Sequence, residues 1–193
     1  NLLFFGALAQ LKRWGYAGFA ALMEVDCRPL RRGWLDALDR LARRHPEAWV
    51  IGSVYRGHGL FGGNIKRHLN GNALYAVGST AFHDFLDQGY LAWLQGLDTA
   101  WERFLDSADP EGANSAEWRV VQHVLPRFVT CDEIANIAGE PEIRGQIAFS
   151  RETLRRAFPA ACIVHGPIAP QDRNLDLATL PEDQARLRAE PEL

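Results

Sequence analysis

The hydrophobic positions of residues 1–55 follow two alternating spacings. Residues 2–14 and 33–44 place apolar side chains three or four positions apart, which predicts two amphipathic helices. Residues 18–23 and 47–55 are largely apolar, which is typical of strands buried on both faces of a parallel sheet. The order helix, strand, helix, strand predicts an α/β fold in which a mostly parallel central sheet is flanked by helices, as in Rossmann-like proteins.

The rest of the chain predicts further elements of both kinds around one long loop. Residues 56–72 are rich in Gly and polar side chains, so we expect a functional or mobile loop there. Residues 169–193 are rich in Pro and charged residues, which predicts an extended tail or linker after a domain spanning residues 1–168. The later predicted elements are strands within 73–78, 127–137 and 161–166 and helices within 80–106, 115–125 and 150–158.

Composition narrows the class of function without identifying it. The chain has 193 residues, of which 47% are hydrophobic and 23% charged, as expected for a globular domain. A formal net charge of −3 gives no broad attraction for nucleic acid, and the apolar stretch 18–23 is too short to span a membrane. Cys27, Cys131 and Cys162 form no C-x-x-C pair and cannot all pair with one another, so we expect reduced thiols and a cytoplasmic protein.

Two carboxylates follow the first predicted strand. Glu24 and Asp26 lie at its carboxyl end, where α/β sheets bind ligands, and alternate positions in a strand share one face. Oxygen ligands of this kind suit Mg²⁺ or Mn²⁺, which proteins hold with one or two carboxylates together with substrate phosphates. The structural alternative is that the two acids cap the turn or pair with Arg28 or Arg31.

A second candidate is the segment Asn70-Gly71-Asn72, which precedes the strand predicted within 73–78. Asn-Gly is a strong turn signal, so a turn is the structural interpretation. Asn side chains also carry paired donors and acceptors, which suit sugar hydroxyls. An Asn-Gly-Asn turn is therefore a candidate substrate-binding segment.

His165 ends the last predicted strand, directly before Gly166 and Pro167. A single His at a strand end is more often structural than a ligand. Imidazole is nevertheless a normal ligand for ions such as Mn²⁺, and Glu24 and Asp26 already follow another strand. Because parallel neighbours end at the same edge of a sheet, we expect Asp26 and His165 to lie close together.

These segments together produce a resemblance to a known family. In order, "MEVDCRPLRRGWLDAL", "WVIGSVYRG", "HLNGNALYAVG" and "IVHG" resemble the nucleotide-diphospho-sugar transferases of the GT-A fold, over roughly residues 1–168. In that family a D-x-D-type motif ends a central strand and binds a divalent cation that bridges the donor diphosphate. By that likeness Asp26 matches the last acid of the motif and His165 the distal ligand, so both are expected to bind Mn²⁺ or Mg²⁺. Glu24 stands where the family has the first Asp, and we expect it to contact the substrate.

The resemblance implies a metal-dependent glycosyltransferase that moves a sugar from a nucleotide-diphospho-sugar donor to a glycan or other hydroxyl acceptor. Arg56 and Lys66 are expected to add positive charge near the donor phosphates. Asp98 and Glu102, one helical turn apart, are candidates for the catalytic base that activates the acceptor. Solvated surface charges are the alternative for all four. Family members begin with a strand that binds the nucleotide base, so a chain that starts at Asn1 is expected to be the carboxyl-terminal part of such a domain, without the first nucleotide-binding unit.

Two other functions compete with this one. A catalytically degenerate module of the same fold would hold a sugar or a partner without turnover, and Glu24 in the motif favours it. A metal-dependent phosphohydrolase also places acids after a strand. It requires a nucleophilic Asp and a basic partner further on, and the surroundings of "EVDC" offer no comparable signature.

Overall fold

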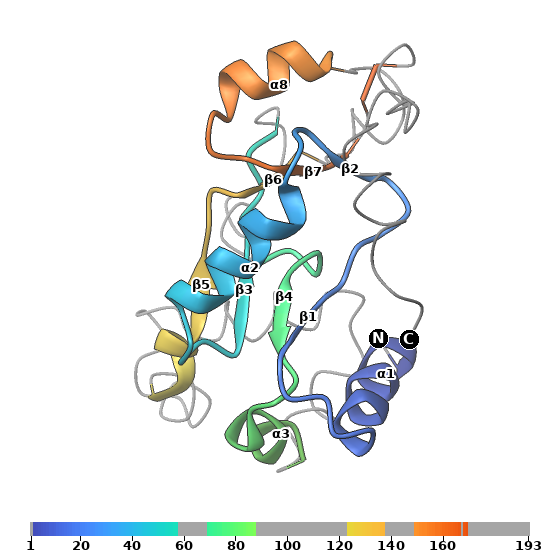
Figure 1. The fold of residues 1–193 in the computed structure, drawn as a ribbon, viewed down its shortest axis with the longest axis vertical. Coiled ribbons are helices and arrows are strands. Elements are labelled where there is room, and N and C mark those ends of the chain that lie inside the picture. Colours follow the sequence, from blue (N-terminus) through green and yellow to red (C-terminus); the bar gives the residue numbers. More distant parts are fainter. Residues whose placement is uncertain (1, 58–68, 88–122, 138–148, 167, 170–193) are drawn as a thin grey trace, which may run out of the picture.

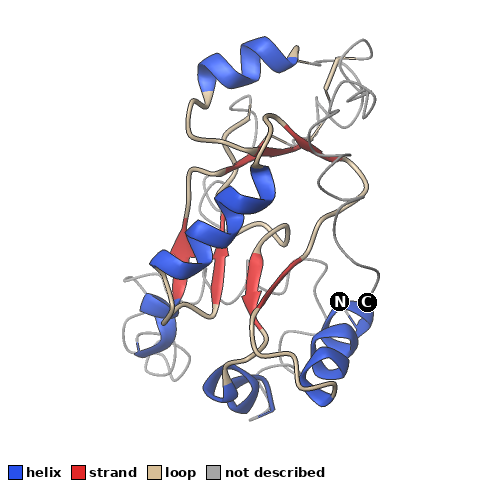
Figure 2. Cartoon of the chain, in the orientation of Figure 1, coloured by secondary structure: helices blue, strands red, loops and turns tan. Residues whose placement is uncertain are grey.

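The computed structural model describes residues 2–57, 69–87, 123–137, 149–166 and 168–169, which form an α/β fold (Figure 1). Figure 2 shows the same view with helices and strands distinguished by colour. In chain order the elements are α1 (Leu2–Arg13), β1 (Phe19–Ala21), β2 (Cys27–Pro29), α2 (Trp34–Arg44), β3 (Val50–Gly52), β4 (Leu74–Ala76), α3 (Thr80–Phe85), a 3₁₀ helix (Leu125–Arg127), β5 (Phe128–Thr130), β6 (Ile134–Asn136), α8 (Arg151–Ala157) and β7 (Ile163–His165).

Most of the predicted elements are present, although the strands are shorter than predicted. The strand predicted within 47–55 is the three-residue β3, and β2 is a strand that the hydrophobic pattern did not predict. Of the helix predicted within 80–106, α3 is described, whereas residues 88–122 lie outside the described residues, as do residues 170–193 of the predicted tail. Among the described helices, none combines the length and the apolar character needed to cross a bilayer.

The strands form two mixed sheets, and the prediction of a mostly parallel sheet is not confirmed. The sheets have the orders β1-β4-β3-β5 and β2-β7-β6. β4 is antiparallel to both β1 and β3, and β2 is antiparallel to β7, whereas β3–β5 and β6–β7 are parallel pairs. A continuous apolar run reports burial of both strand faces, which central antiparallel strands also have. The sequence pattern therefore does not determine strand direction.

α2 lies over the four-stranded sheet and joins the two sheets into one core (Figure 1). Its leucines Leu38 and Leu41 are buried in a cluster with Ile51 of β3. The same cluster contains Cys27 of β2 and Ile163 of β7. Burying each leucine side chain contributes about 2 kcal/mol, so this helix holds the second sheet in place above the first.

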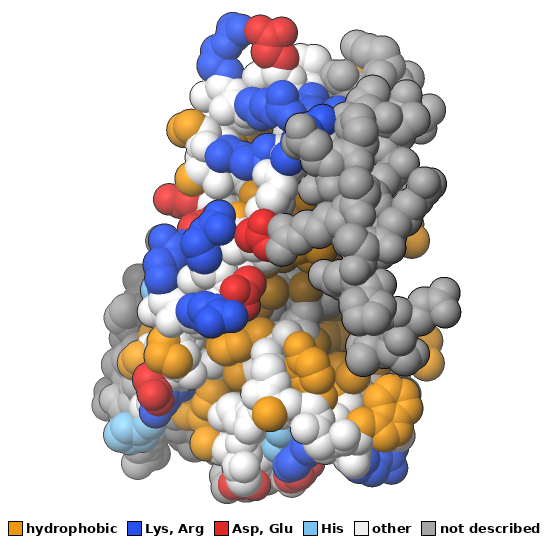
Figure 3. Space-filling view, viewed as in Figure 1, with side chains coloured by type: hydrophobic (Ala, Val, Ile, Leu, Met, Phe, Trp, Pro, Cys, Tyr) orange, Lys and Arg blue, Asp and Glu red, His pale blue; other side chains and the backbone are white. Residues whose placement is uncertain are grey.

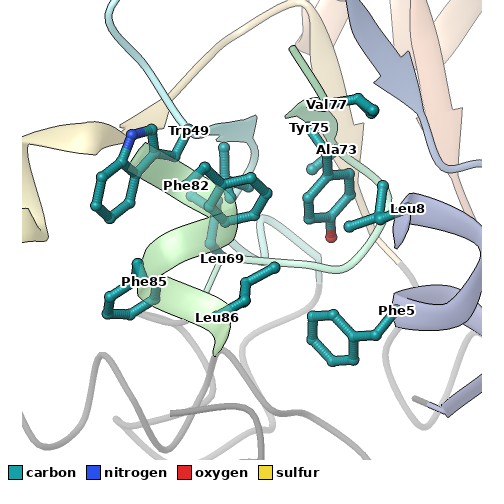
Figure 4. Packing of buried hydrophobic residues seen from close by; sticks show 11 residues of the cluster. Phe5, Leu8, Trp49, Leu69, Ala73, Tyr75, Val77, Phe82, Phe85 and Leu86 are labelled. Carbon is teal, nitrogen blue, oxygen red and sulfur yellow. The ribbon is translucent and has the colours of Figure 1, made fainter. Parts of the chain in front are cut away.

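A second cluster fixes β4 from the side of α1 and α3. Figure 4 shows Phe5 and Leu8 of α1 near Tyr75 of β4, and Trp49 beside Phe82 of α3. The Trp49 and Phe82 ring centroids are 5.8 Å apart, a distance at which aromatic rings attract one another. Because β4 is anchored on this side, the segment before it, residues 70–72, has a fixed position.

Candidate metal centre

Glu24 and Asp26 lie in the tight turn that connects β1 to β2. The backbone N–H of Cys27 donates to the carbonyl oxygen of Glu24 (3.0 Å), which closes the turn. Val25 occupies its apex and is 93% exposed. Both carboxylates reach the same imidazole, so their common orientation comes from the turn and not from the alternation along a strand that the sequence predicted.

His165 meets these acids because β2 and β7 are antiparallel. Cys27, at the start of β2, is the register partner of His165, at the end of β7. His165 Nε2 lies 2.9 Å from Glu24 Oε2 and 3.3 Å from Asp26 Oδ1. The predicted proximity of Asp26 and His165 is confirmed. The predicted cause was wrong, since an antiparallel pair and not parallel neighbours brings these residues together.

Asn136 holds the other side of the imidazole. It is the register partner of His165 in the parallel pair β6–β7, and it is buried. The Nδ1–H of His165 donates to Asn136 Oδ1 (3.0 Å). This bond fixes the ring so that Nε2 faces Glu24 and Asp26. The sequence analysis missed Asn136, although a polar residue within the apolar run "EIANI" was a signal that could have identified it.

Negative charge is concentrated around Nε2 of His165. Two carboxylates face one ring nitrogen, and the other ring nitrogen is already occupied by Asn136. With a neutral ring, the Nε2 lone pair and the carboxylate oxygens would repel one another across a short distance. A metal ion bound by all three side chains removes this repulsion, as does a proton between Nε2 and one of the carboxylates, so the cluster is a candidate site for a cation.

The three side chains also have the spacing of metal ligands. One ligand atom from each of Glu24, Asp26 and His165 lies within 4.8 Å of the others. Ligands about 2.1 Å from an octahedral ion are about 3 Å apart when they are neighbours, which matches the two distances to Nε2. The acids are partly exposed, at 57% and 43%, whereas the imidazole is buried, so an ion can enter from one side. Glu24, predicted to contact the substrate, is thus also a potential third ligand.

The Asn72 side chain makes four hydrogen bonds, and two of them position Glu24. Its side chain is buried, and its Nδ2 group donates to Glu24 Oε2 (2.9 Å) and to Asn70 Oδ1 (2.8 Å). Its Oδ1 atom accepts from the backbone N–H of Glu24 (2.7 Å) and from the Cys27 thiol (3.1 Å). Both donors and both acceptor positions of the amide are used inside the protein. The structure therefore gives Asn72 a positioning role that the sequence did not predict.

Asn70 and Gly71, which precede Asn72, have fewer hydrogen bonds within the part of the protein that the structure describes. Asn70 uses its Oδ1 atom to accept from the backbone N–H (2.9 Å) and the side chain of Asn72, while its NH₂ group makes no hydrogen bond within the described residues. The carbonyl oxygen of Gly71 accepts from the Tyr75 hydroxyl (2.8 Å). As far as the described part of the chain is concerned, Asn70 has two donors left for a ligand. Sugar binding by this segment remains a prediction.

Cys27 adjoins the cluster, and its thiol is engaged by Asn72. Burial raises the pKa of its thiol to about 12, and the negative charges of Asp26 and Glu24 act in the same direction. The thiol is therefore neutral near pH 7 and serves as the donor to Asn72. A metal ligand or a nucleophile would require the thiolate.

Of the remaining predicted site residues, Arg56 lies beside the cluster, because its backbone N–H donates to the carbonyl oxygen of Asn136 (2.7 Å). The Arg56 guanidinium pairs with Asp132 and also donates to the carbonyl oxygen of Cys131 (3.3 Å). Lys66, Asp98 and Glu102 lie outside the described residues. Their predicted roles at the donor phosphates and at the acceptor remain predictions.

Comparisons of this chain with protein-family models, with curated proteins and with solved structures found no significant match.

Proposed function

We propose that this chain is a metal-dependent glycosyltransferase domain of the GT-A class, which moves a sugar from a nucleotide-diphospho-sugar donor to a hydroxyl acceptor. The observation that carries the proposal is the convergence of Glu24, Asp26 and His165 at one point. Two segments that are far apart in the sequence supply these ligands, and the segments are among those that resemble the family. The order of the acidic motif, the Asn-Gly-Asn segment and the distal His supports the same function.

The donor set fits Mn²⁺ or Mg²⁺. Two carboxylate oxygens and one imidazole nitrogen are hard and borderline ligands, and the mixed set favours Mn²⁺ over an ion that prefers sulfur. When bound, such an ion supplies positive charge to the departing nucleoside diphosphate. The protein's own contribution is orientation: Asn72 holds Glu24, and Asn136 keeps Nε2 of His165 directed at the site.

The reaction requires further groups for the acceptor and for the donor phosphates. Asn70, whose NH₂ group has no partner among the described residues, is our candidate for binding a sugar hydroxyl. We assign activation of the acceptor to Asp98 or Glu102 and binding of the donor phosphates to Arg56 and Lys66. These last four assignments rest on the family resemblance.

Calorimetric titration with MnCl₂, alone and then with a panel of uridine, guanosine and thymidine diphosphate sugars, tests the proposal. We expect one Mn²⁺ per chain and donor binding that requires the ion. Asp26→Asn should lower the Mn²⁺ affinity by about tenfold or more. Asp84→Asn is the matched control, because Asp84 is an exposed acid of α3 with no part in the cluster.

The outcomes separate the proposal from its main competitor. Mn²⁺-dependent donor binding with sugar transfer supports the transferase. Donor binding that is weak and independent of Mn²⁺ identifies a non-catalytic module. If Mn²⁺ does not bind, or if Asp26→Asn and Asp84→Asn behave alike, the metal centre is refuted and the three side chains only hold β2 and β7 together.

A further inference from the structure

A strongly basic hollow lies along α2 and includes the amino-terminal end of that helix. It has a volume of about 520 Å³, within the range of small-molecule sites. Cys162, which precedes β7, lines it, whereas His165 of the metal centre ends that strand. Five of its lining residues are arginines, namely Arg31, Arg32, Arg40, Arg43 and Arg44. We call this hollow the arginine pocket.

The positive charge of the arginine pocket is local. The chain as a whole has a formal net charge of −3, yet Glu133 is the one acid among the described residues that line the pocket. Glu133 pairs with Arg44, and Arg43 pairs with Asp39 (2.8 Å) on the helix surface. Arg40 makes neither a hydrogen bond nor an ion pair with any described residue. The pocket thus keeps an excess of cationic groups, which repel one another until an anion is bound.

The backbone adds to this charge. Gly33, which lines the pocket, is the N-cap of α2 and has a φ of 65° in the left-handed region. No side chain of the described residues caps the helix, so the first N–H groups of α2 are not satisfied by a capping residue. The amino-terminal end of a helix carries a partial positive charge and favours anions. The arginines and the helix end are independent features that favour the same kind of ligand.

We propose that the arginine pocket binds a phosphate group, carried either by a soluble phosphorylated molecule or by a lipid headgroup. Guanidinium groups present forked donors that match phosphate oxygens, and several around one hollow can bind one group together. Figure 3 shows Lys and Arg side chains gathered over α2 and above it on one face of the molecule. This site is separate from the metal centre and does not depend on the function proposed for it.

A lipid headgroup is a possible carrier of the phosphate because an apolar hollow adjoins the arginine pocket. Arg43 also lines this second hollow, together with apolar side chains that include Tyr16 and Leu35. Leu35 is 63% exposed, and Figure 3 shows hydrophobic side chains below α2 in the same view. A basic cluster beside exposed apolar groups is suited to an anionic membrane surface.

Titration with inorganic pyrophosphate in the presence of EDTA tests the proposal, because chelation removes any binding through the metal centre. We expect saturable binding that weakens as salt is added. Arg40→Ala should lower the affinity by about tenfold, the effect of losing one charge-assisted hydrogen bond. Arg156→Ala, which removes an exposed arginine of α8 outside the pocket, is the matched control and should change the affinity less than about twofold.

Sedimentation with vesicles distinguishes the two sources of phosphate. Phosphatidylcholine vesicles containing phosphatidic acid present a phosphate monoester, and phosphatidylserine vesicles provide a charge control. Preference for phosphatidic acid, lost in Arg40→Ala, supports a lipid headgroup, whereas pyrophosphate binding alone supports a soluble ligand. Binding of neither probe, or equal losses in Arg40→Ala and Arg156→Ala, overturns the proposal. Asp26→Asn should retain pyrophosphate binding in EDTA, so failure of the metal centre is recognised separately.

Discussion

Replacing Asn72 with alanine should weaken both the fold and the candidate metal centre. The Asn72 amide is buried and connects the turn that carries Glu24 to the segment before β4. Replacement by alanine removes all four hydrogen bonds of the side-chain amide at once. It leaves the backbone N–H of Glu24 without its partner and frees the Glu24 carboxylate to rotate into solvent.

The expected loss of stability follows from the four bonds of this amide, two to Glu24, one to Cys27 and one to Asn70. A neutral hydrogen bond contributes about 0.5–1.5 kcal/mol net, and one to a charged group about 1.5–3 kcal/mol. Solvent reaches the exposed Glu24 side chain and reduces the contribution of the charged bond. We therefore expect the free energy of unfolding to fall by about 2–4 kcal/mol.

Urea unfolding in EDTA, followed by tryptophan fluorescence, measures this change, and calorimetry with MnCl₂ measures the effect on the site. The Mn²⁺ affinity of Asn72→Ala should fall by about tenfold to a hundredfold, as for other residues that orient a metal ligand. Asn70→Ala is the matched control. It removes the acceptor for the Asn72 backbone N–H and for one side-chain donor but leaves both contacts with Glu24, so its effect on the Mn²⁺ affinity should be smaller. If Asn72→Ala matches the wild type in both measurements, Asn72 does not position Glu24.

Three further predictions concern other parts of the molecule. Asn136→Ala should lower the Mn²⁺ affinity by about tenfold or more, and Asn136→Asp, which keeps an acceptor for His165, should restore much of it in the same titration. Gly78→Ala should lower the free energy of unfolding by at least about 2 kcal/mol in urea, because a Cβ there would lie 2.1 Å from the carbonyl oxygen of Ala17. Gly6→Ala, in α1 with open space around it, should instead gain about 0.5–1 kcal/mol. Burial raises the pKa values of the three thiols from 9.0 to about 11 or 12, so the unfolded state loses their protons first as the pH rises. The free energy of unfolding should therefore fall above about pH 9, and a urea series that shows no decline would contradict this reasoning.

Within the described residues, the sequence predicted α1, α2, α3 and α8 and most of the strands, because their apolar spacing reports burial directly. It did not predict β2, since Cys27, Arg28 and Pro29 show neither alternation nor a continuous apolar run. That strand is held by its pairing with β7, a long-range contact that local patterns do not contain. The antiparallel direction of β4 and β2 was also not predicted, because strand direction depends on long-range pairing.

The candidate site was also predicted only in part. The sequence predicted that Asp26 and His165 would lie close together, because acids and a His near strand ends are visible in the sequence. The structure does place them close together. The roles of Asn72 and Asn136 were not predicted. The sequence does not show whether an Asn side chain binds a ligand or a neighbouring side chain. Asn136 lies beside the imidazole because of the register of β6 against β7, which is a long-range feature.

The pairing of β2 with β7 also has a consequence for the order in which the chain folds. Strands β3 to β6 all lie between them in the sequence, so the contacts from Glu24 and Asp26 to His165 close a long loop. Closing such a loop has a high entropic cost that is repaid only when the intervening strands are in place. An ion bound by these three residues would stabilise the closed loop once the other strands have formed. At a free concentration about one hundred times its dissociation constant it would add about 2.7 kcal/mol to the free energy of unfolding, mainly by slowing the opening of the second sheet.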